Sequence, residues 1–162
     1  MGRKRIQIGD VFEMPLSDGR VAYGQYVFLD EKMGPLIRVF DLFTRGEVPW
    51  EQLVDQLQSA GLLFPPVITG LFAAIRAGFW KIIGHMPTGE FTYPGFISTM
   101  HESYKQLSDW YLWDGKESVR LGRELPARYK HMEFLAGWDP HGVVHRIETG
   151  ENPYDKLIRG PQ

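Results

Sequence analysis

Residues 12–23, FEMPLSDGRVAY, combine alternating apolar residues with an Asp-Gly pair, and this stretch decides the fold class. Asp-Gly is a preferred pair for a two-residue hairpin turn, because both central positions of such a turn need a positive φ. The stretch therefore predicts two antiparallel strands that turn at Asp18–Gly19. This turn sets a register that is apolar on one face: Leu16 opposite Val21, Met14 opposite Tyr23, and Phe12 next along the same face.

A second hairpin is predicted over about residues 107–121, because Asp114–Gly115 repeats the turn signal. One face of this hairpin is apolar: Trp110 opposite Val119, with Leu112 and Leu121 beside them. The other face mixes charges with two aromatic residues: Asp109 opposite Arg120, Tyr111 opposite Ser118, and Trp113 opposite Lys116. Two hairpins on similar turns account for the shared signal without an internal duplication.

The rest of the chain reads as short strands with a few helices. Further strands are predicted for residues 35–43, 80–83, 93–99 and 132–138. Helices are predicted from Pro49–Trp50 to a stop at Gly61, over 126–131, and from Asp139–Pro140 to Gly150. Leu71–Ala77 favours a helix capped by Thr69 and ended by Gly78, with a strand as the alternative. The fold class is therefore α+β, mainly an antiparallel β-sheet or barrel with a few peripheral helices.

Composition limits the size and the partners of the protein. A chain of 162 residues, of which 43% are hydrophobic, predicts a single domain over 1–162, with a compact core at about 6–150 and a C-terminal tail at 151–162. A formal net charge of -2 offers no global field for nucleic acid or for an anionic membrane. Cysteine is absent from the sequence, which excludes disulfides and thiolate catalysis.

The sequence also predicts a cytoplasmic protein that does not enter a membrane. The basic start MGRKRIQIGD is not followed by the apolar run of a signal peptide. The most apolar stretch, GLLFPPVITGLFAAI, is interrupted by Pro65–Pro66 and is too short to span a bilayer.

Three polar side chains on the predicted helix after Asp139 raise the possibility of a metal site. His141, His145 and Glu148 lie at positions i, i+4 and i+7 and so share one face. Two imidazoles and a carboxylate at this spacing suit zinc, and a metal-dependent hydrolase is one alternative function. However, Gly142 stands where a zinc-protease helix needs a glutamate. We therefore interpret the stripe as a solvated face, and neither a metal nor another cofactor is expected.

A short basic segment, Arg3 to Arg5, gives a second alternative, a small RNA-binding β-barrel. A nucleic-acid surface is expected to be wider and to carry stacking aromatic side chains, so binding of nucleic acid is not predicted.

The polar face of the second hairpin is the candidate partner-binding surface. It carries Asp109, Tyr111, Trp113 and Arg120, and Tyr, Trp and Arg are the residues that dominate binding hot spots. The alternative is that a helix or loop of the same domain covers this face, because large aromatic side chains are usually well buried.

Several longer segments resemble one known family. IGDVFEMPLSDGRVAYGQYVF at 8–28 resembles the opening of immunity protein 26, a family of bacterial polymorphic-toxin systems. FPPVITGLFAAIRAGFWKIIG, WYLWDG and DPHGVVHRIETG are similar to further parts of that family, and the resemblance extends from about Ile6 to Gly150. None of these segments carries a catalytic motif.

The resemblance implies a protein that binds and neutralises a cognate toxin domain by direct protein–protein interaction. Members of such families are generally small, cytoplasmic and non-enzymatic, and they act by covering the active site of the toxin or by locking its conformation. The resemblance supplies no binding residues position by position, so the predicted partner-facing set comes from the hairpin alone.

Overall fold

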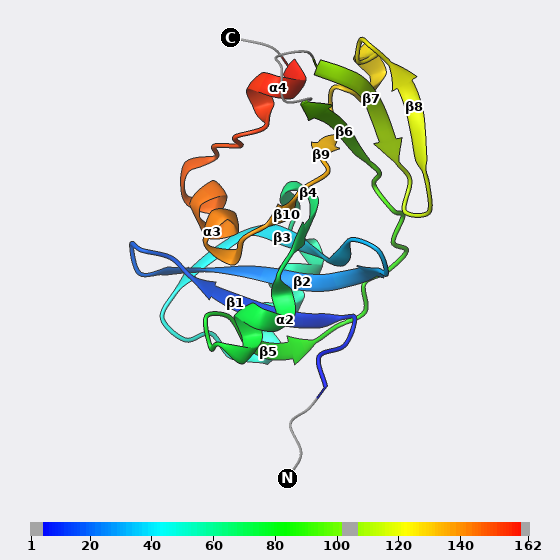
Figure 1. Ribbon diagram of the computed structural model, residues 1–162. Coiled ribbons are helices and arrows are strands. Elements are labelled where there is room, and N and C mark those ends of the chain that lie inside the picture. Colours follow the sequence, from blue (N-terminus) through cyan, green and yellow to red (C-terminus); the bar gives the residue numbers. More distant parts are fainter. Residues whose placement is uncertain (1–4, 102–106, 160–162) are drawn as a thin grey trace. The chain divides into compact units, whose positions relative to one another are not determined.

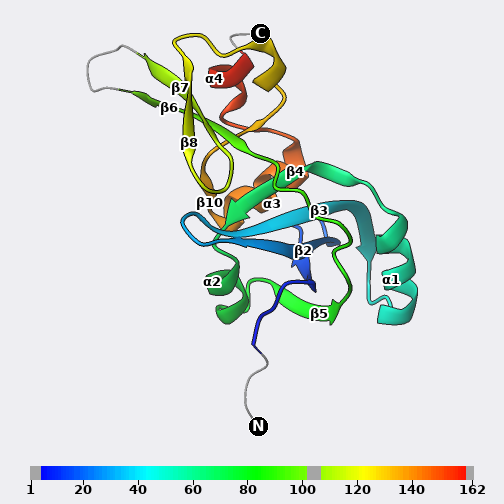
Figure 2. The ribbon, with the colours of Figure 1, turned by 90° about the vertical axis from the view of Figure 1, so that its right-hand side faces the viewer.

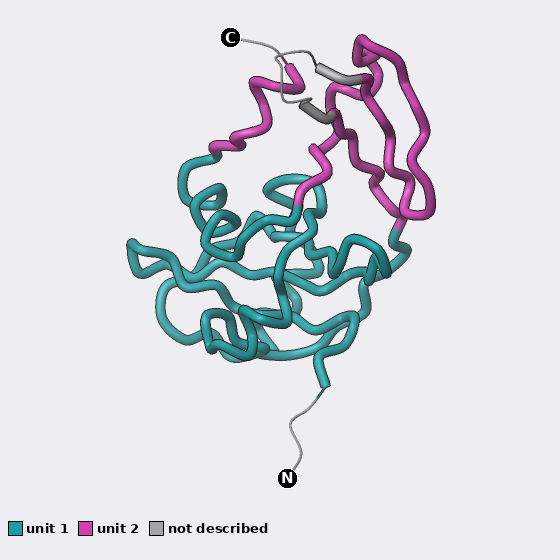
Figure 3. Tube along the Cα trace, in the orientation of Figure 1, with its two compact units in different colours: residues 1–91, 137–150 teal, residues 92–136, 151–162 magenta. Residues whose placement is uncertain are grey.

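A computed structural model describes residues 5–101 and 107–159 (Figure 1, with a side view in Figure 2). Within these residues the strands form two mixed sheets with helices around them, which confirms the predicted α+β class. The chain divides into two compact units, residues 1–91 with 137–150 (unit 1) and residues 92–136 with 151–162 (unit 2), coloured separately in Figure 3. Each unit therefore consists of two segments that are not adjacent in the sequence.

Unit 1 is built on a six-stranded sheet in the order β10-β4-β3-β2-β1-β5. Its strands have the following bounds: β1 Asp10–Pro15, β2 Arg20–Asp30, β3 Gly34–Arg45, β4 Leu62–Thr69, β5 Lys81–His85 and β10 Gly137–Trp138. Neighbouring strands are antiparallel except for the short parallel pair of β10 and β4. The predicted strand at 35–43 is confirmed as β3, and the one at 80–83 overlaps β5.

Helices cover both faces of this sheet, and Figure 2 shows α1 and α2 on opposite sides of it. Helix α1 (Trp50–Ser59) packs on a cluster that includes Tyr23 and Phe40. Helix α2 (Leu71–Arg76) lies on the other face, where the Phe72 ring meets Tyr26 edge-on. Helix α3 (Pro140–Thr149) starts and ends as predicted, because the Asp139 side chain accepts from the backbone N–H of His141 and Gly150 adopts φ 75°.

The register of the first hairpin corrects the prediction by one residue. Val21 pairs with Pro15, and Tyr23 pairs with Glu13. The loop is residues 17–19, closed by a hydrogen bond from the Leu16 N–H to the Arg20 carbonyl (2.8 Å). Gly19 in this loop takes the left-handed conformation, at φ 87°. A three-residue loop of this kind moves every side chain of one strand to the other face relative to a two-residue turn.

Both faces of this hairpin are therefore core. Phe12 and Met14 face the α2 side, whereas Val11 and Tyr23 belong to the cluster under α1. On the α2 side the ring of Phe12 stacks on Trp80 with centroids 5.2 Å apart. Phe12 also lies over its strand partner Gly24, where a Cβ would come within 2.5 Å of the Phe12 Cζ. The glycine is thus required by the close approach of an aromatic ring to the backbone.

Two predictions next to this core were incomplete. Strand β4 was not predicted, because Pro65–Pro66 argue against a strand inside a sheet. The prolines lie where the pairing of β3 with β4 shifts register, between Phe64 and Val67, so they leave the regular ladder. Leu71–Ala77 is helical as favoured, but Thr69 is not its cap, since its hydroxyl donates to the Trp138 carbonyl (2.7 Å).

Unit 2 holds a four-stranded sheet in the order β8-β7-β6-β9. Its elements have the following bounds: β6 Phe96–His101, β7 Leu107–Trp113, β8 Ser118–Gly122, β9 Glu133–Phe134, the 3₁₀ turn η1 Ala127–Tyr129 and α4 Asp155–Arg159. Its core joins Ile97 and Trp110 to Ile158 of α4, and Phe134 stacks on Tyr154 at 4.8 Å. The segment predicted as a C-terminal tail therefore contributes a helix and a core residue to this unit.

The predicted strand at 132–138 is corrected to two short strands in two different sheets. Strand β9 pairs in parallel with β6, and β10 pairs in parallel with β4. Leu135 still donates its N–H to the Ile97 carbonyl (2.8 Å), after which the chain leaves the sheet of unit 2. A continuous apolar run does not reveal such a change of sheet, because both halves are equally apolar.

The second hairpin is confirmed, but its register is shifted. Trp113 pairs with Ser118, and Tyr111 pairs with Arg120, around a loop of residues 114–117. The Asp114 carboxylate accepts from the backbone N–H groups of Glu117 and Lys116, both at 2.8 Å. These two bonds, that from Glu117 first, lower the pKa of Asp114. A side chain that closes its own loop thus replaces the predicted two-residue turn.

Candidate functional site: a groove beside helix α1

The predicted partner-binding surface lies in unit 2 and is only partly assembled as expected. The Arg120 Nε donates to Asp109 Oδ2 at 2.5 Å, although the two residues are not directly opposite in the ladder. This hydrogen bond raises the pKa of Arg120, which is exposed, and Tyr111 is half-buried beside it. The charge pair and one aromatic residue are therefore brought together.

Trp113 does not lie at the surface, because only 4% of it is exposed. The alternative of a covered face therefore holds for this ring. The neighbouring residue that is exposed instead is Val119 of β8, at 43%. The role of Asp109, Tyr111, Trp113 and Arg120 in binding a partner stays a prediction, and we refer to this set as the β7–β8 patch.

The residues of the two alternative functions have other surroundings. The His141 ring packs against Phe79 with centroids 4.2 Å apart, and Glu148 accepts the Ser17 N–H at 2.8 Å. Over residues 5–101 and 107–159, no group of three or more histidine, aspartate or glutamate side chains is placed to hold a metal ion. Of the basic segment at the N-terminus, Arg5 is exposed, and the two residues before it lie outside the described part of the chain.

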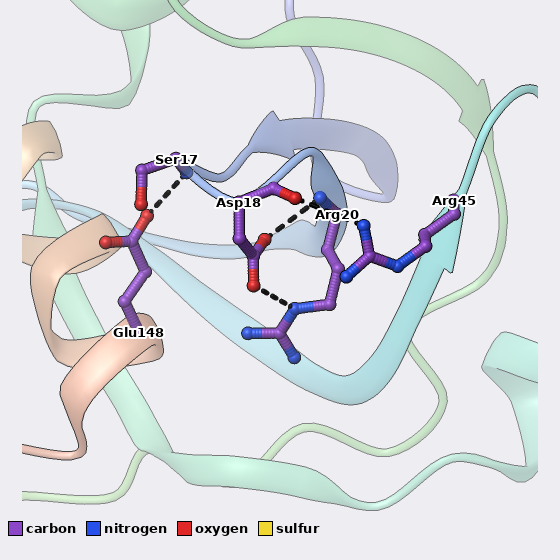
Figure 4. Close-up of polar contacts among 5 residues, drawn as sticks. All are labelled: Ser17, Asp18, Arg20, Arg45 and Glu148. Atoms are coloured by element: carbon purple, nitrogen blue, oxygen red, sulfur yellow. Dashed lines mark hydrogen bonds and ion pairs between the residues drawn. The ribbon is translucent and has the colours of Figure 1, made fainter.

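Glu148 fixes the turn of the first hairpin from the side, as Figure 4 shows. In the same turn the Asp18 carboxylate accepts from the Arg20 backbone N–H (3.0 Å) and from its Nε (2.7 Å). Arg45 on β3 donates to the Asp18 carbonyl (3.1 Å). The turn is thus held by one contact from α3 and one from β3, and its Gly19 lines a groove of unit 1.

We expect the pKa of Asp18 to lie below the ordinary aspartate value of about 3.9. The hydrogen bonds from Arg20, that of the backbone first, favour the carboxylate. Because the folded pKa is lowered, the stabilisation of the turn is complete above the ordinary value and is lost as the pH falls through the folded value. An NMR titration of the carboxyl carbon checks this, with Asp18→Asn as a non-titrating control. A midpoint at or above about 3.9 contradicts it.

A groove of about 670 Å³ lies in unit 1, and we call it the hairpin groove. Its lining comes from the first hairpin, the β3–α1 connection, α1 and β5: Glu13, Gly19, Val21, Tyr23, Gly46, Glu47, Val48, Pro49, Trp50, Leu53, Lys81 and Ile83. Aromatic and aliphatic side chains make up much of this lining, whereas Glu47 and Lys81 are exposed charges at its rim. Apolar side chains together with a few charges are the general anatomy of a binding site.

Trp50 is the main side chain of this groove, and it packs against the backbone of β5. A Cβ added to Gly84 would lie 2.5 Å from the Trp50 Cε2, so the indole lies directly against the glycine. Trp50 is half-buried. Beside it the Tyr23 hydroxyl is hydrogen-bonded to the Thr44 hydroxyl (2.6 Å), and burial raises the pKa of Tyr23, which keeps the phenol protonated.

Sequence reasoning placed Trp50 only at the start of a helix and missed the groove. A glycine inside a strand often marks the close approach of another group, but the strand was predicted to end at residue 83, one residue before Gly84, which lies within β5. Nothing in the sequence indicates that this group is Trp50, since the two residues are far apart along the chain.

Comparison with known protein families identifies the family of this chain. The family model of immunity protein 26 matches residues 7–106, which is more than half of the sequence. The chain belongs to the immunity protein 26 family. A search of curated proteins found no match, and a search of solved structures found none either.

The matched span separates the candidate surfaces. It contains the whole hairpin groove, whereas all residues of the β7–β8 patch lie beyond residue 106. The segments WYLWDG and DPHGVVHRIETG also lie outside the matched span. Among the helices that the structure describes, none has the length and apolar character needed to cross a membrane.

Proposed function

We propose that this protein neutralises a cognate polymorphic-toxin domain by binding to it directly. The observation that carries the proposal is the family match over residues 7–106. The protein acts by occupying a surface of the toxin, without catalysis and without a cofactor, in the cytoplasm of the cell that it protects. Covering the toxin's active site and locking an inactive conformation are both compatible with this mode of action.

The hairpin groove is the primary contact surface in this proposal. Three features support it: the aromatic anchor Trp50, the charged residues at the rim, and a location wholly inside the matched span. Tryptophan is one of the residue types enriched among binding hot spots, and Trp50 is half-buried in this hollow. The β7–β8 patch is retained as a second contact surface, with Arg120 and Tyr111 as its accessible members.

The experiment that tests the function is a pull-down of the tagged protein from the source bacterium at moderate salt, followed by mass spectrometry. We expect one stoichiometric partner that carries a toxin domain and stops growth when it is expressed alone. Co-expression of the present protein is expected to restore growth. A toxin that binds but still kills in the presence of the protein would contradict neutralisation.

We expect Arg120→Ala to weaken binding of that toxin about fivefold. Arg120 is exposed and paired with Asp109, and exposed charges contribute modestly to affinity and mainly to the association rate. Titration calorimetry with Arg123→Ala as a charge-matched control checks this, because Arg123 is exposed in the same unit. Equal affinities for the two variants would remove the β7–β8 patch from the interface.

A further inference from the structure

A second hollow in unit 1 contains an arginine and no acidic residue. It measures about 330 Å³ and we call it the Arg38 pocket. Its lining is almost entirely apolar or neutral: Arg38, Phe40, Leu57, Gln58, Ala60, Leu62, Met86, Pro87, Thr88 and Gly89. Arg38 is thus the one charged side chain among the residues that line it.

A chain of hydrogen bonds fixes the orientation of this arginine. The Arg38 Nε donates to Gln25 Oε1 at 2.8 Å. Gln25 is fully buried, and its Nε2 donates to the carbonyls of Gly9 (3.1 Å) and Met86 (2.8 Å). With both amide protons directed at carbonyl acceptors, the glutamine oxygen has to face Arg38. The guanidinium is therefore positioned by the core beneath it.

The charge of Arg38 is not balanced within the described part of the chain. Over residues 5–101 and 107–159, Arg38 has no ion pair and no hydrogen bond beyond that to Gln25, and its guanidinium lies 5.3 Å from the centroid of the Phe40 ring. Burial is the cause that lowers its pKa, with no contribution from a carboxylate. A half-buried cation without a counter-charge costs folding free energy, because desolvation is not offset by an ionic partner.

We propose that the Arg38 pocket receives the carboxylate of an aspartate or glutamate side chain of the toxin partner. The planar guanidinium binds a carboxylate through two parallel hydrogen bonds, and such bidentate pairs are the strong ones. This inference rests on the proposed function and adds the chemistry of one contact.

The surroundings favour a protein side chain over a free small anion. Leu62 is 42% exposed at the pocket, so an exposed apolar side chain lies beside the charge and can help to exclude water from a protein contact. The pocket also shares helix α1 with the hairpin groove, because Leu57 lines the one and Leu53 lines the other. Ten residues of helix measure about 15 Å, so a partner surface of about 800 Å² is large enough to reach both hollows.

The test uses the toxin obtained by pull-down and four proteins: wild type, Arg38→Gln, Arg38→Lys and Arg76→Gln. Arg38→Gln removes the charge, whereas Arg38→Lys keeps it and loses the fork. Arg76 is an exposed arginine of unit 1 that lines neither hollow. We expect affinity to fall at least about thirtyfold for Arg38→Gln, about tenfold for Arg38→Lys, and less than about twofold for Arg76→Gln.

Thermal unfolding separates binding from a structural role. Arg38→Gln is expected to change the melting temperature little, since removal of the unbalanced charge offsets the loss of the hydrogen bond to the buried Gln25 Oε1. A fall in melting temperature that accounts for the lost affinity would overturn the proposal. If wild type binds the toxin and Arg38→Gln binds equally well, the Arg38 proposal fails while the proposed function stands. If wild type itself does not bind, the proposed function fails.

A second arm distinguishes the source of the carboxylate. The probe is N-acetylglutamate methylamide, with the neutral N-acetylglutamine methylamide as control, and the readout is the NMR signal of the Arg38 Nε–H. We expect a shift with the acidic probe only, at millimolar concentration. A small carboxylate that binds at micromolar concentration, together with unchanged toxin affinity of Arg38→Gln, would assign the pocket to a free anion and overturn the partner contact.

Discussion

Replacing Phe12 with alanine is expected to lower the free energy of unfolding by about 3–5 kcal/mol. Phe12 is 1% exposed, stacks on Trp80, and fills the space that the missing side chain of Gly24 leaves over β2. Truncation removes the buried ring and leaves a cavity between a rigid sheet and a fully buried tryptophan, so the site cannot collapse easily. Chemical denaturation followed by tryptophan fluorescence measures the change.

Ile8→Ala provides the matched control for this prediction. Ile8 precedes the same strand but is 46% exposed, and its truncation is expected to cost less than about 0.5 kcal/mol. If Phe12→Ala and Ile8→Ala cost the same, the ring of Phe12 does not occupy the position described between Gly24 and Trp80.

Replacing Trp50 with alanine is expected to weaken toxin binding about 100-fold, as for a central hot-spot residue. Trp50 is half-buried, its indole lies against Gly84, and it contributes the largest side chain of the hairpin groove. Its removal deletes the apolar anchor and leaves the charged rim of Glu47 and Lys81 around an enlarged hollow. Calorimetric titration of the purified toxin domain gives the affinity.

Trp50 also packs on the core cluster under α1, so a control that loses packing on this cluster alone is needed. Val54→Ala supplies it, because Val54 lies on the same helix against the same cluster but does not line the groove. A third variant, Gly84→Ala, keeps the tryptophan and displaces it, since the added Cβ meets the indole at 2.5 Å. We expect Gly84→Ala to weaken binding and Val54→Ala to leave it unchanged. Equal losses for Trp50→Ala and Val54→Ala would exclude the groove as the primary contact.

Local signals in the sequence predicted most elements correctly. The Asp139 cap, Pro140 and Gly150 delimit α3 because their chemistry acts within a few residues. The two Asp-Gly pairs located both hairpins for the same reason. The register of the first hairpin was wrong because both of its faces are buried, so that a shift of one residue exchanges one apolar face for another.

Features that depend on distant parts of the chain were not predictable in this way. The division of residues 132–138 between β9 and β10 is decided by two partner strands in different sheets. The burial of Trp113 and the contact of Trp50 with Gly84 are likewise set by tertiary packing. Arg38 gave a usable signal, a charged residue inside the apolar run LIRVF at 36–40, but its neutral surroundings become evident only in the folded chain.

The most direct test of the account is to titrate the purified toxin domain with this protein while heat release and toxin activity are recorded on the same samples. Direct neutralisation predicts a tight complex with about one protein per toxin, and a loss of toxin activity that follows the fraction bound. A toxin that stays fully active when saturated with the protein, or an excess of protein that releases no heat and leaves activity unchanged, would contradict it.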